Sequence, residues 1–285
     1  KEIVINDKSS ILLDKLFLCI GHSAHDTYHL LYEKGVLLEP KPFAIGFRVE
    51  HPQILINQIQ FGEKYKSHPL LSSASYKLTY RTATGRNIFS FCMCPGGKVI
   101  CASNQQGRLV VNGMSDFERD SSYANSAVVI GISVADYYQD SVLDGLSFIE
   151  KYERKAFELG GKSFSAPAQK LVDYFDSKIT NQIPSSLYKP TVTPANLNEI
   201  FSENINQEFK EAFRAFNNKM KGFVSEDALL IGVETRTSSP IRIPRKENYE
   251  HVEIKGLYPI GEGAGYSGGI ISSALDGLKV ASVSY

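Results

Sequence analysis

A glycine-rich segment near the C-terminal end of the sequence holds the residues best suited to bind a ligand. It contains five glycines between Gly261 and Gly269 and directly follows the apolar residues Leu257 to Ile260. Glycine permits a positive φ and the close approach of another group, and the amides at the start of a following helix attract anions. Glu262 can accept hydrogen bonds from a sugar or ribityl hydroxyl. The segment predicts a ligand-binding turn between a strand and a helix, although a tight turn without a ligand would use the same glycines.

Three histidines raise the possibility of a metal site. His22, His25 and His29 are three and seven positions apart, which would align three imidazoles on one helical face, and imidazole is a good ligand for zinc. Histidine spacing alone is a weak signal, and we expect His22 in the turn before the helix. We therefore predict no metal here, but a loop contact by His22 and two surface or capping histidines.

Two cysteines could form a redox pair. Cys92 and Cys94 are two positions apart on a predicted strand, so both side chains are expected on one face, and Cys101 is a candidate for the partnering strand. The alternative is that they are small buried side chains beside a hairpin turn at residues 95–97. We assign them no thiol mechanism.

Both ends of the chain show α/β patterns. The apolar run Leu16 to Ile20 does not alternate, which is typical of a strand buried on both faces, and Gly21 separates it from a helix predicted over residues 22–34. Near the other end, residues 228–235 read as a buried strand, and the glycine-rich segment leads into a final helix. We expect α/β units at both termini.

The middle of the chain shows a different pattern of predicted strands and helices. Residues 43–50 alternate like a half-buried strand, and residues 75–138 read as a meander of antiparallel strands. Helices are predicted over residues 142–160, 167–178 and 197–220. The last carries an apolar stripe that we expect in the core, made by Phe201, Ile205, Phe209, Phe213 and Phe216.

The fold class predicted from these patterns is α/β and α+β. Residues 1–38 and 230–285 would form a partial Rossmann-like domain of the dinucleotide-binding type. Residues 39–229 would form an inserted domain with a mixed antiparallel sheet and helices, which would hold the substrate.

Composition narrows the function classes. The chain has 285 residues, and 31 Lys and Arg balance 31 Asp and Glu, which argues against nucleic acid or an anionic membrane as the main partner. No apolar stretch approaches the roughly 20 residues that span a bilayer. The sequence shows no basic and apolar leader and no disulfide-dense pattern, so we expect a cytoplasmic location.

Several short motifs together resemble one family. Besides the glycine-rich segment, these are Gly21–Ala24, Phe91–Gly97, Asn112–Ser115 and Glu234–Pro240. With them, nearly the whole chain resembles the uncharacterised bacterial FAD-dependent dehydrogenases, which are flavoprotein oxidoreductases. The resemblance implies FAD as the cofactor, a small-molecule substrate and NAD(P)H as a candidate electron donor.

The resemblance also implies roles for particular residues. Glu262 would bind the ribityl chain, the amides around it would face the flavin and the pyrophosphate, and the loop after Leu16–Ile20 would close over the cofactor. The implied cofactor-binding residues are Gly21, His22, Ser23, Ala24, Gly261, Glu262, Gly263, Ala264, Gly265, Tyr266, Ser267, Gly268, Gly269 and Ile270. Glu234–Pro240 would lie near the isoalloxazine ring, with Arg236, Ser238 and Ser239 as substrate-binding candidates; a surface salt bridge is the alternative role for Arg236.

Two departures from the family pattern shape the prediction. The sequence has no Gly-x-Gly-x-x-Gly turn for the FAD pyrophosphate, and it starts with Lys1, so we expect the C-terminal part of a longer flavoprotein that is not active by itself. His25 stands where the family pattern has arginine, so an anion contact there would be lost or depend on pH. The alternative function is a non-catalytic binding or interaction module whose glycine-rich turn is structural.

Overall fold

The chain forms two compact units. The computed structural model describes residues 2–284. Unit 1 comprises the described residues of Lys1–Phe43, Ser133–Ser147 and Ser238–Tyr285, and unit 2 comprises Ala44–Ile132 and Phe148–Thr237. Unit 1 thus includes residues 133–147, which the sequence patterns had assigned to the insert. The content is mixed, and the α+β class expected for the middle of the chain is confirmed.

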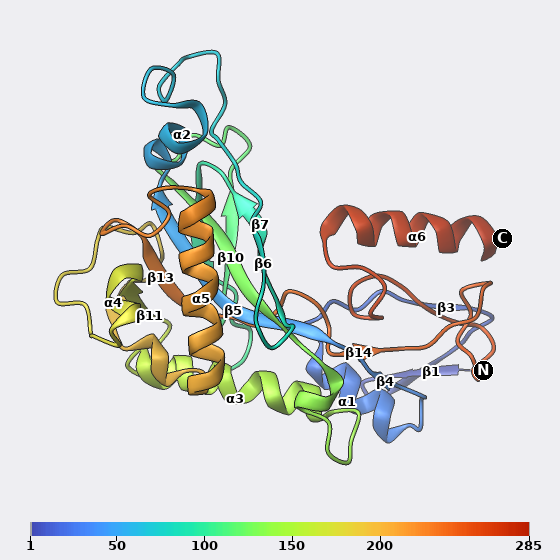
Figure 1. The fold of residues 1–285 in the computed structure, drawn as a ribbon. Coiled ribbons are helices and arrows are strands. Elements are labelled where there is room, and N and C mark those ends of the chain that lie inside the picture. Colours follow the sequence, from blue (N-terminus) through green and yellow to red (C-terminus); the bar gives the residue numbers. More distant parts are fainter. Residues whose placement is uncertain (1, 285) are drawn as a thin grey trace. The chain divides into compact units, whose positions relative to one another are not determined.

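Unit 2 is built on a seven-stranded sheet (Figure 1). Its edge pair is parallel, and four of the other pairs of neighbours are antiparallel. In spatial order the strands are β12 (Val192–Pro194), β11 (Ala166–Lys170), β13 (Leu229–Glu234), β5 (Phe43–Pro52), β10 (Tyr123–Ile132), β7 (Asn87–Cys94) and β6 (Thr79–Arg81).

Strand β5 lies in the middle of this sheet and is buried on both faces. Its residues from Phe43 to His51 are all buried, including Arg48 and Glu50. The prediction of a half-buried strand was wrong, because the polar residues at alternate positions also face the interior. A buried charge needs partners, so this strand requires polar groups on its neighbours.

Helix α5 (Glu203–Lys219) supplies much of the core of unit 2. The burial of the predicted apolar stripe is confirmed: its five members are at most 9% exposed, although Phe201 lies before the helix. The helix starts later than expected, since a separate 3-10 turn forms at Leu197–Glu199 and Ser202 precedes the first helical residue. The other helices of this region are α2 (Gln53–Phe61), α3 (Asp144–Leu159) and α4 (Leu171–Phe175).

The helix predicted over residues 167–178 is mostly absent. Its first part is strand β11, where Ala168 pairs with Ile231 of β13 and Pro167 pairs with Thr193 of β12. Only the short helix α4 follows. Sheet pairing on both sides outweighs the local helix signal of a proline at a helix start.

The predicted meander is divided into two sheets. Strands β6, β7 and β10 belong to the large sheet, whereas β8 (Gly97–Cys101) and β9 (Val111–Ser115) form a separate hairpin. Cys101 therefore pairs with β9 and not with the strand of Cys92 and Cys94. The large sheet skips β8 and β9, so sequence order does not give the strand order.

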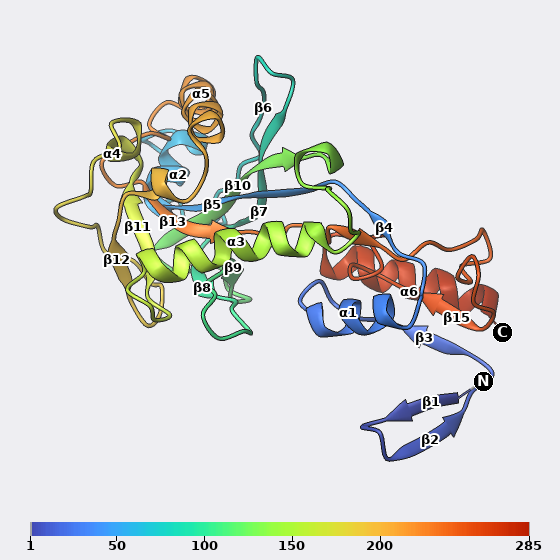
Figure 2. The same ribbon diagram turned by 90° about the horizontal axis from the view of Figure 1, so that it is seen from below.

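Unit 1 has three small sheets of two strands each. They are β1 (Glu2–Ile5) with β2 (Ser9–Leu12), β4 (Glu39–Pro40) with β14 (Ile241–Arg242), and β3 (Leu16–Leu18) with β15 (Leu257–Pro259). Figure 2 shows the β1–β2 hairpin most clearly. The helices are α1 (His25–Glu33), the 3-10 turn Val134–Asp136, and α6 (Ile270–Ser284).

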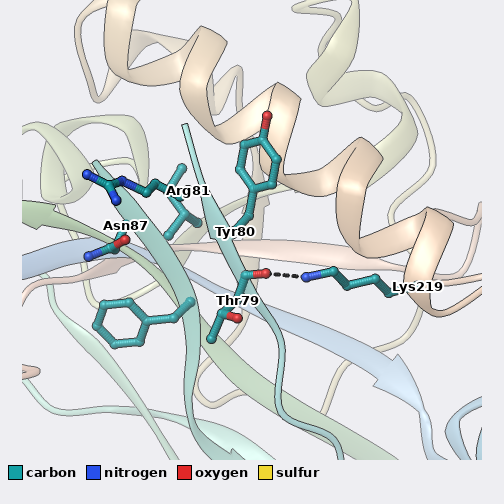
Figure 3. Close-up of a pocket in the computed structure, with 7 residues that line it drawn as sticks. Thr79, Tyr80, Arg81, Asn87 and Lys219 are labelled. Carbon is teal, nitrogen blue, oxygen red and sulfur yellow. Dashed lines mark hydrogen bonds between the residues drawn. The ribbon is translucent and has the colours of Figure 1, made fainter. Parts of the chain in front are cut away.

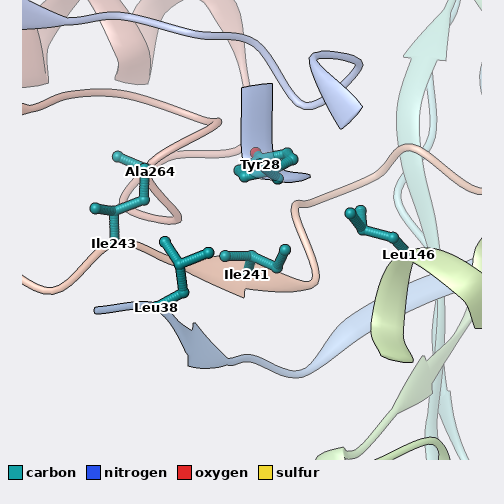
Figure 4. Close-up of a cluster of buried hydrophobic side chains, with 6 residues drawn as sticks. All are labelled: Tyr28, Leu38, Leu146, Ile241, Ile243 and Ala264. Carbon is teal, nitrogen blue, oxygen red and sulfur yellow. The ribbon is translucent and has the colours of Figure 1, made fainter. Parts of the chain in front are cut away.

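A compact apolar cluster holds the segments of unit 1 together (Figure 4). It combines side chains from α1, the start of α3 and the segments around β14 and the glycine-rich turn. Its buried members are Tyr28, Leu38, Leu146, Ile241, Ile243 and Ala264. Residues distant in sequence thus share one small core.

Candidate functional site

The two predicted cofactor segments lie side by side in unit 1. Strands β3 and β15 run parallel, with Leu16 opposite Leu257 and Leu18 opposite Pro259. Beyond the strands, the Gly263 amide donates a hydrogen bond to the Ile20 carbonyl at 3.1 Å. Because both strands end at the same edge, the loop Gly21–Ala24 lies beside the glycine-rich turn.

Two glycines of the turn are required by its geometry. Gly261 has a φ of 79°, in the left-handed region that side chains disfavour. At Gly263, a Cβ would lie 2.1 Å from the Ile20 carbonyl oxygen, so the close approach of the two loops admits only glycine. At Gly269, by contrast, the nearest atom to a Cβ is Ser272 Oγ at 3.8 Å, and the site is open.

Several amides of the turn bind acceptors within the protein. The Gly265 amide donates to the Glu262 carbonyl at 2.9 Å, and the Tyr266 amide donates to the Gly261 carbonyl at 3.1 Å. The Gly261 amide donates to the Asp276 carboxylate at 2.8 Å. A ligand would therefore meet the side chain of Glu262 and the start of α6 more readily than these amides.

An ion pair fixes the base of the turn. Both carboxylate oxygens of Asp276 accept hydrogen bonds from Arg245, at 2.9 and 2.6 Å. Burial opposes ionisation, but the bonds from Arg245 and Gly261 outweigh it and lower the pKa of Asp276. The Arg245 guanidinium also lies over the Tyr266 ring, 3.7 Å from its centroid. The turn is thereby tied to α6.

Glu262 and His22 approach each other from the two loops. His22 Nδ1 is 4.0 Å from Glu262 Oε1, and the Glu262 side chain remains 28% exposed while that of His22 is buried. His25, the first residue of α1, is also buried, which corrects its prediction as a surface or capping residue. His29 is exposed. Among residues 2–284, no three His, Cys, Asp or Glu side chains form a group that could hold a metal ion.

Tyr28 is a buried contact of the turn that the sequence motifs did not single out. Its hydroxyl donates to the Gly263 carbonyl at 2.8 Å and lies 3.1 Å from Ser239 Oγ. Burial raises the pKa of Tyr28 to about 12, and the negative charge of Glu262 adds to the effect, so the hydroxyl stays protonated.

Two of the three predicted substrate-binding residues form bonds inside the protein. In unit 1, Ser239 is buried and its hydroxyl also bonds the backbone of Ile241, whereas Ser238 is half-buried. In unit 2, Arg236 forms an ion pair with the buried Glu153, with Nε 3.3 Å from Oε1. An incoming anion would have to displace Glu153, and the salt bridge is buried, not on the surface as the alternative had it.

Arg48 is the second residue that the motifs missed, and it lies where three of them meet in unit 2. The guanidinium donates to Glu234 Oε2 at 2.8 Å, to the Cys92 carbonyl at 2.9 Å, and to Asn112 Oδ1 at 2.6 Å. A fourth bond reaches Asn125 Oδ1 at 3.1 Å. Charged residues at alternate positions of an otherwise apolar strand were the only signal of this network.

Burial governs the ionisable groups around Arg48. It raises the pKa of Glu234, although the adjacent guanidinium opposes this shift, and it likewise raises the pKa of Cys94. Cys92 is exposed and has a φ of 43° at a bulge of β7 opposite β10. The bulge breaks the two-residue alternation, so the prediction that Cys92 and Cys94 share one face was wrong.

A shallow pocket of about 440 Å³ lies elsewhere in unit 2, at the edge of the large sheet (Figure 3). Lys219 of α5 donates a hydrogen bond to the Thr79 carbonyl there. The pocket is lined by Thr79, Tyr80, Arg81, Asn87, Ile88, Phe89 and Lys219. It contains none of the predicted site residues and no carboxylate, histidine or cysteine for acid–base chemistry.

Comparison with known proteins gives the family. Residues 42–237, which include all of unit 2, match the family described as FAD-dependent protein, C-terminal domain-like. The chain belongs to this family, which associates it with flavoproteins.

One relative extends the likeness to both units. An uncharacterised protein of Clostridium beijerinckii is 44% identical over 286 residues, which covers 99% of this chain and 53% of the relative. The chain spans about half the length of this curated relative. No helix within residues 2–284 is long and apolar enough to cross a membrane.

Proposed function

We propose that this chain is the C-terminal part of an FAD-dependent oxidoreductase. In it, the glycine-rich turn of unit 1 forms one wall of the flavin site. The parallel pairing of β3 with β15 carries the proposal, because it brings Gly21–Ala24 beside Gly261–Gly265 at the carboxyl ends of two parallel strands. Dinucleotides bind at such edges of α/β folds.

The residues present fit a flavin in part. The Glu262 side chain is 28% exposed, and its carboxylate can accept hydrogen bonds from ribityl hydroxyls. Gly269 leaves open space just before the N-terminus of α6, where a phosphate oxygen would be favoured. The bound amides of Gly261 and Gly265 do not fit the expected phosphate cradle, so the pyrophosphate would be held mainly by another part of the polypeptide.

If another part of the polypeptide holds the pyrophosphate, the residues of unit 1 have the following roles. A bound flavin would supply the redox chemistry. Glu262 would orient the ribityl chain, and Tyr28 would hold Gly263 in place through its hydrogen bond to that carbonyl. NAD(P)H is the proposed electron donor, and a small molecule the proposed substrate. The four free cysteines are in keeping with a reducing, cytoplasmic location, which we also propose.

A titration with FAD tests the proposal. We expect saturable binding, followed by flavin absorbance and fluorescence, that the variant Glu262→Ala weakens about tenfold or more, the loss expected for one charged hydrogen bond of about 1.5–3 kcal/mol. Glu253→Ala, which removes an exposed carboxylate from the same unit, is the matched control.

The titration is made with residues 1–285 and with the full-length polypeptide. If only the full-length polypeptide binds FAD, the result supports a flavin site in which the glycine-rich turn is one wall and another part of the polypeptide supplies the remainder. If neither binds FAD, or if Glu262→Ala binds like the control, the flavin role of the turn is refuted. The alternative, a non-catalytic interaction module with a structural turn, would then stand.

A further inference from the structure

Helix α6 exposes an apolar face to solvent. Ile271, Leu275 and Leu278 are four and three positions apart, so they share one side of the helix, and they are 73%, 51% and 67% exposed. Ile270 at the start is 88% exposed. Of the exposed residues of this helix, Lys279 alone carries a charge. A contiguous apolar face of this kind marks an interaction surface.

The opposite side of α6 already has its packing partners. Val280 is fully buried in a cluster with Tyr258 and Ile260, and Asp276 is bonded to Arg245. The helix is therefore held in unit 1 by one side only.

The sheet formed by β3 and β15 is also smaller than parallel sheets usually are. Strands β3 and β15 have three residues each and pair only with one another within residues 2–284. Parallel strands are normally covered on both faces and form larger sheets. The apolar run Leu16–Ile20 predicted such burial, yet Phe17 is 43% exposed. The strand lacks the cover that its sequence requires.

We propose that the exposed face of α6, made by Ile271, Leu275 and Leu278, and the strand β3 with its exposed Phe17 dock an α/β segment of the same polypeptide. The segment would add at least one strand beside β3 and cover α6. The occupant is inferred from the unpaired edge of a parallel sheet and from the relative, of which this chain covers only 53%. The near absence of charge disfavours an anionic membrane, whose helical ligands are rich in Lys and Arg.

Matched charge insertions test the docking. Leu278→Glu places a carboxylate in the proposed interface, and Leu70→Glu does so at an 86% exposed leucine of unit 2. In residues 1–285 we expect both variants to unfold within a few degrees of the unmodified chain, because both sites face water. In the full-length polypeptide we expect only Leu278→Glu to lower the unfolding temperature. Amide exchange of residues 270–284 should be at least tenfold slower in the full-length polypeptide than in residues 1–285.

The possible results distinguish docking of the same polypeptide from dimerisation and from the proposed flavin site. Equal exchange in both forms, or equal behaviour of the two variants in the full-length polypeptide, overturns it. A dimer of residues 1–285 in sedimentation that Leu278→Glu dissociates would show a second copy as the occupant and also overturn it. The inference rests on the proposed function only in taking the chain as part of a longer polypeptide. The measurements are made without FAD, so protection of α6 in a polypeptide that fails to bind flavin refutes the flavin site alone.

Discussion

Helices α5 and α6 show how differently the two units are built. In α5 the large apolar side chains are buried, as are the charged Glu208 and Lys210, whereas α6 presents Ile271, Leu275 and Leu278 to water. Unit 2 also has a seven-stranded sheet, while the sheets of unit 1 have two strands each. Unit 2 has a closed core, whereas unit 1 leaves an apolar helix face exposed.

The largest expected effect tests the difference between the two helices directly. Phe213→Ala in α5 removes a fully buried ring, and we expect it to cost about 3–5 kcal/mol in the free energy of unfolding. Leu278→Ala in α6 should change it by less than about 0.5 kcal/mol in residues 1–285. Urea unfolding measures both. A comparable loss for the two variants would contradict the contrast.

Replacing Arg48, the central arginine of unit 2, should also lower the free energy of unfolding, but by less than Phe213→Ala. Arg48→Met leaves the buried Glu234 carboxylate without its ion pair, and we expect a loss of about 3 kcal/mol in the free energy of unfolding. Arg81→Met, at an exposed position of β6, is the matched control. If the two arginine variants unfold at the same urea concentration, the network of Arg48 does not stabilise unit 2.

The interior of unit 2 should also make its stability depend on pH. Burial raises the pKa of Glu50 to about 7 and lowers that of its neighbour His51 to about 4. The contribution of Glu50 is then full below its unfolded pKa of about 4.5 and is lost as pH rises towards 7, while that of His51 grows between about pH 4 and 6.5. The two slopes oppose each other.

Replacing Glu50 makes the effect of His51 on the pH dependence of stability measurable. In Glu50→Gln we expect the free energy of unfolding to increase by about 2–3 kcal/mol between pH 4 and 6.5, because of this pair only His51 still titrates. The unmodified chain should show a much flatter profile over this range. Urea unfolding at a series of pH values measures both, and parallel profiles would show that Glu50 is ionised in the folded chain.

The smallest expected effect lies in unit 1. Asp276→Asn weakens the bonds to Arg245 and the Gly261 amide, and we expect a loss of about 1–2 kcal/mol in the free energy of unfolding. Amide exchange of the glycine-rich turn should become faster, while that of β5 in unit 2 stays unchanged. Faster exchange in both units would show that their stabilities are coupled.

The sequence determined the local features with strong periodic or conformational signals. The predicted apolar stripe is buried, since spacings of three and four residues place its members in α5 on one face of the helix. The glycine-rich turn was predicted between a strand and a helix, and it lies between β15 and α6. Gly261 and Gly263 are required there for reasons that local composition already suggested.

Tertiary structure decided which distant residues meet. The sequence could not show that Arg48 joins Cys92, Asn112 and Glu234, because these contacts depend on the strand order of the large sheet and on how the separate β8–β9 hairpin packs. The same holds for β11, where pairing with β12 and β13 overrode a local helix signal. Local patterns determined most of the elements. Long-range pairing determined their partners, the strand β11 and which polar groups are buried together.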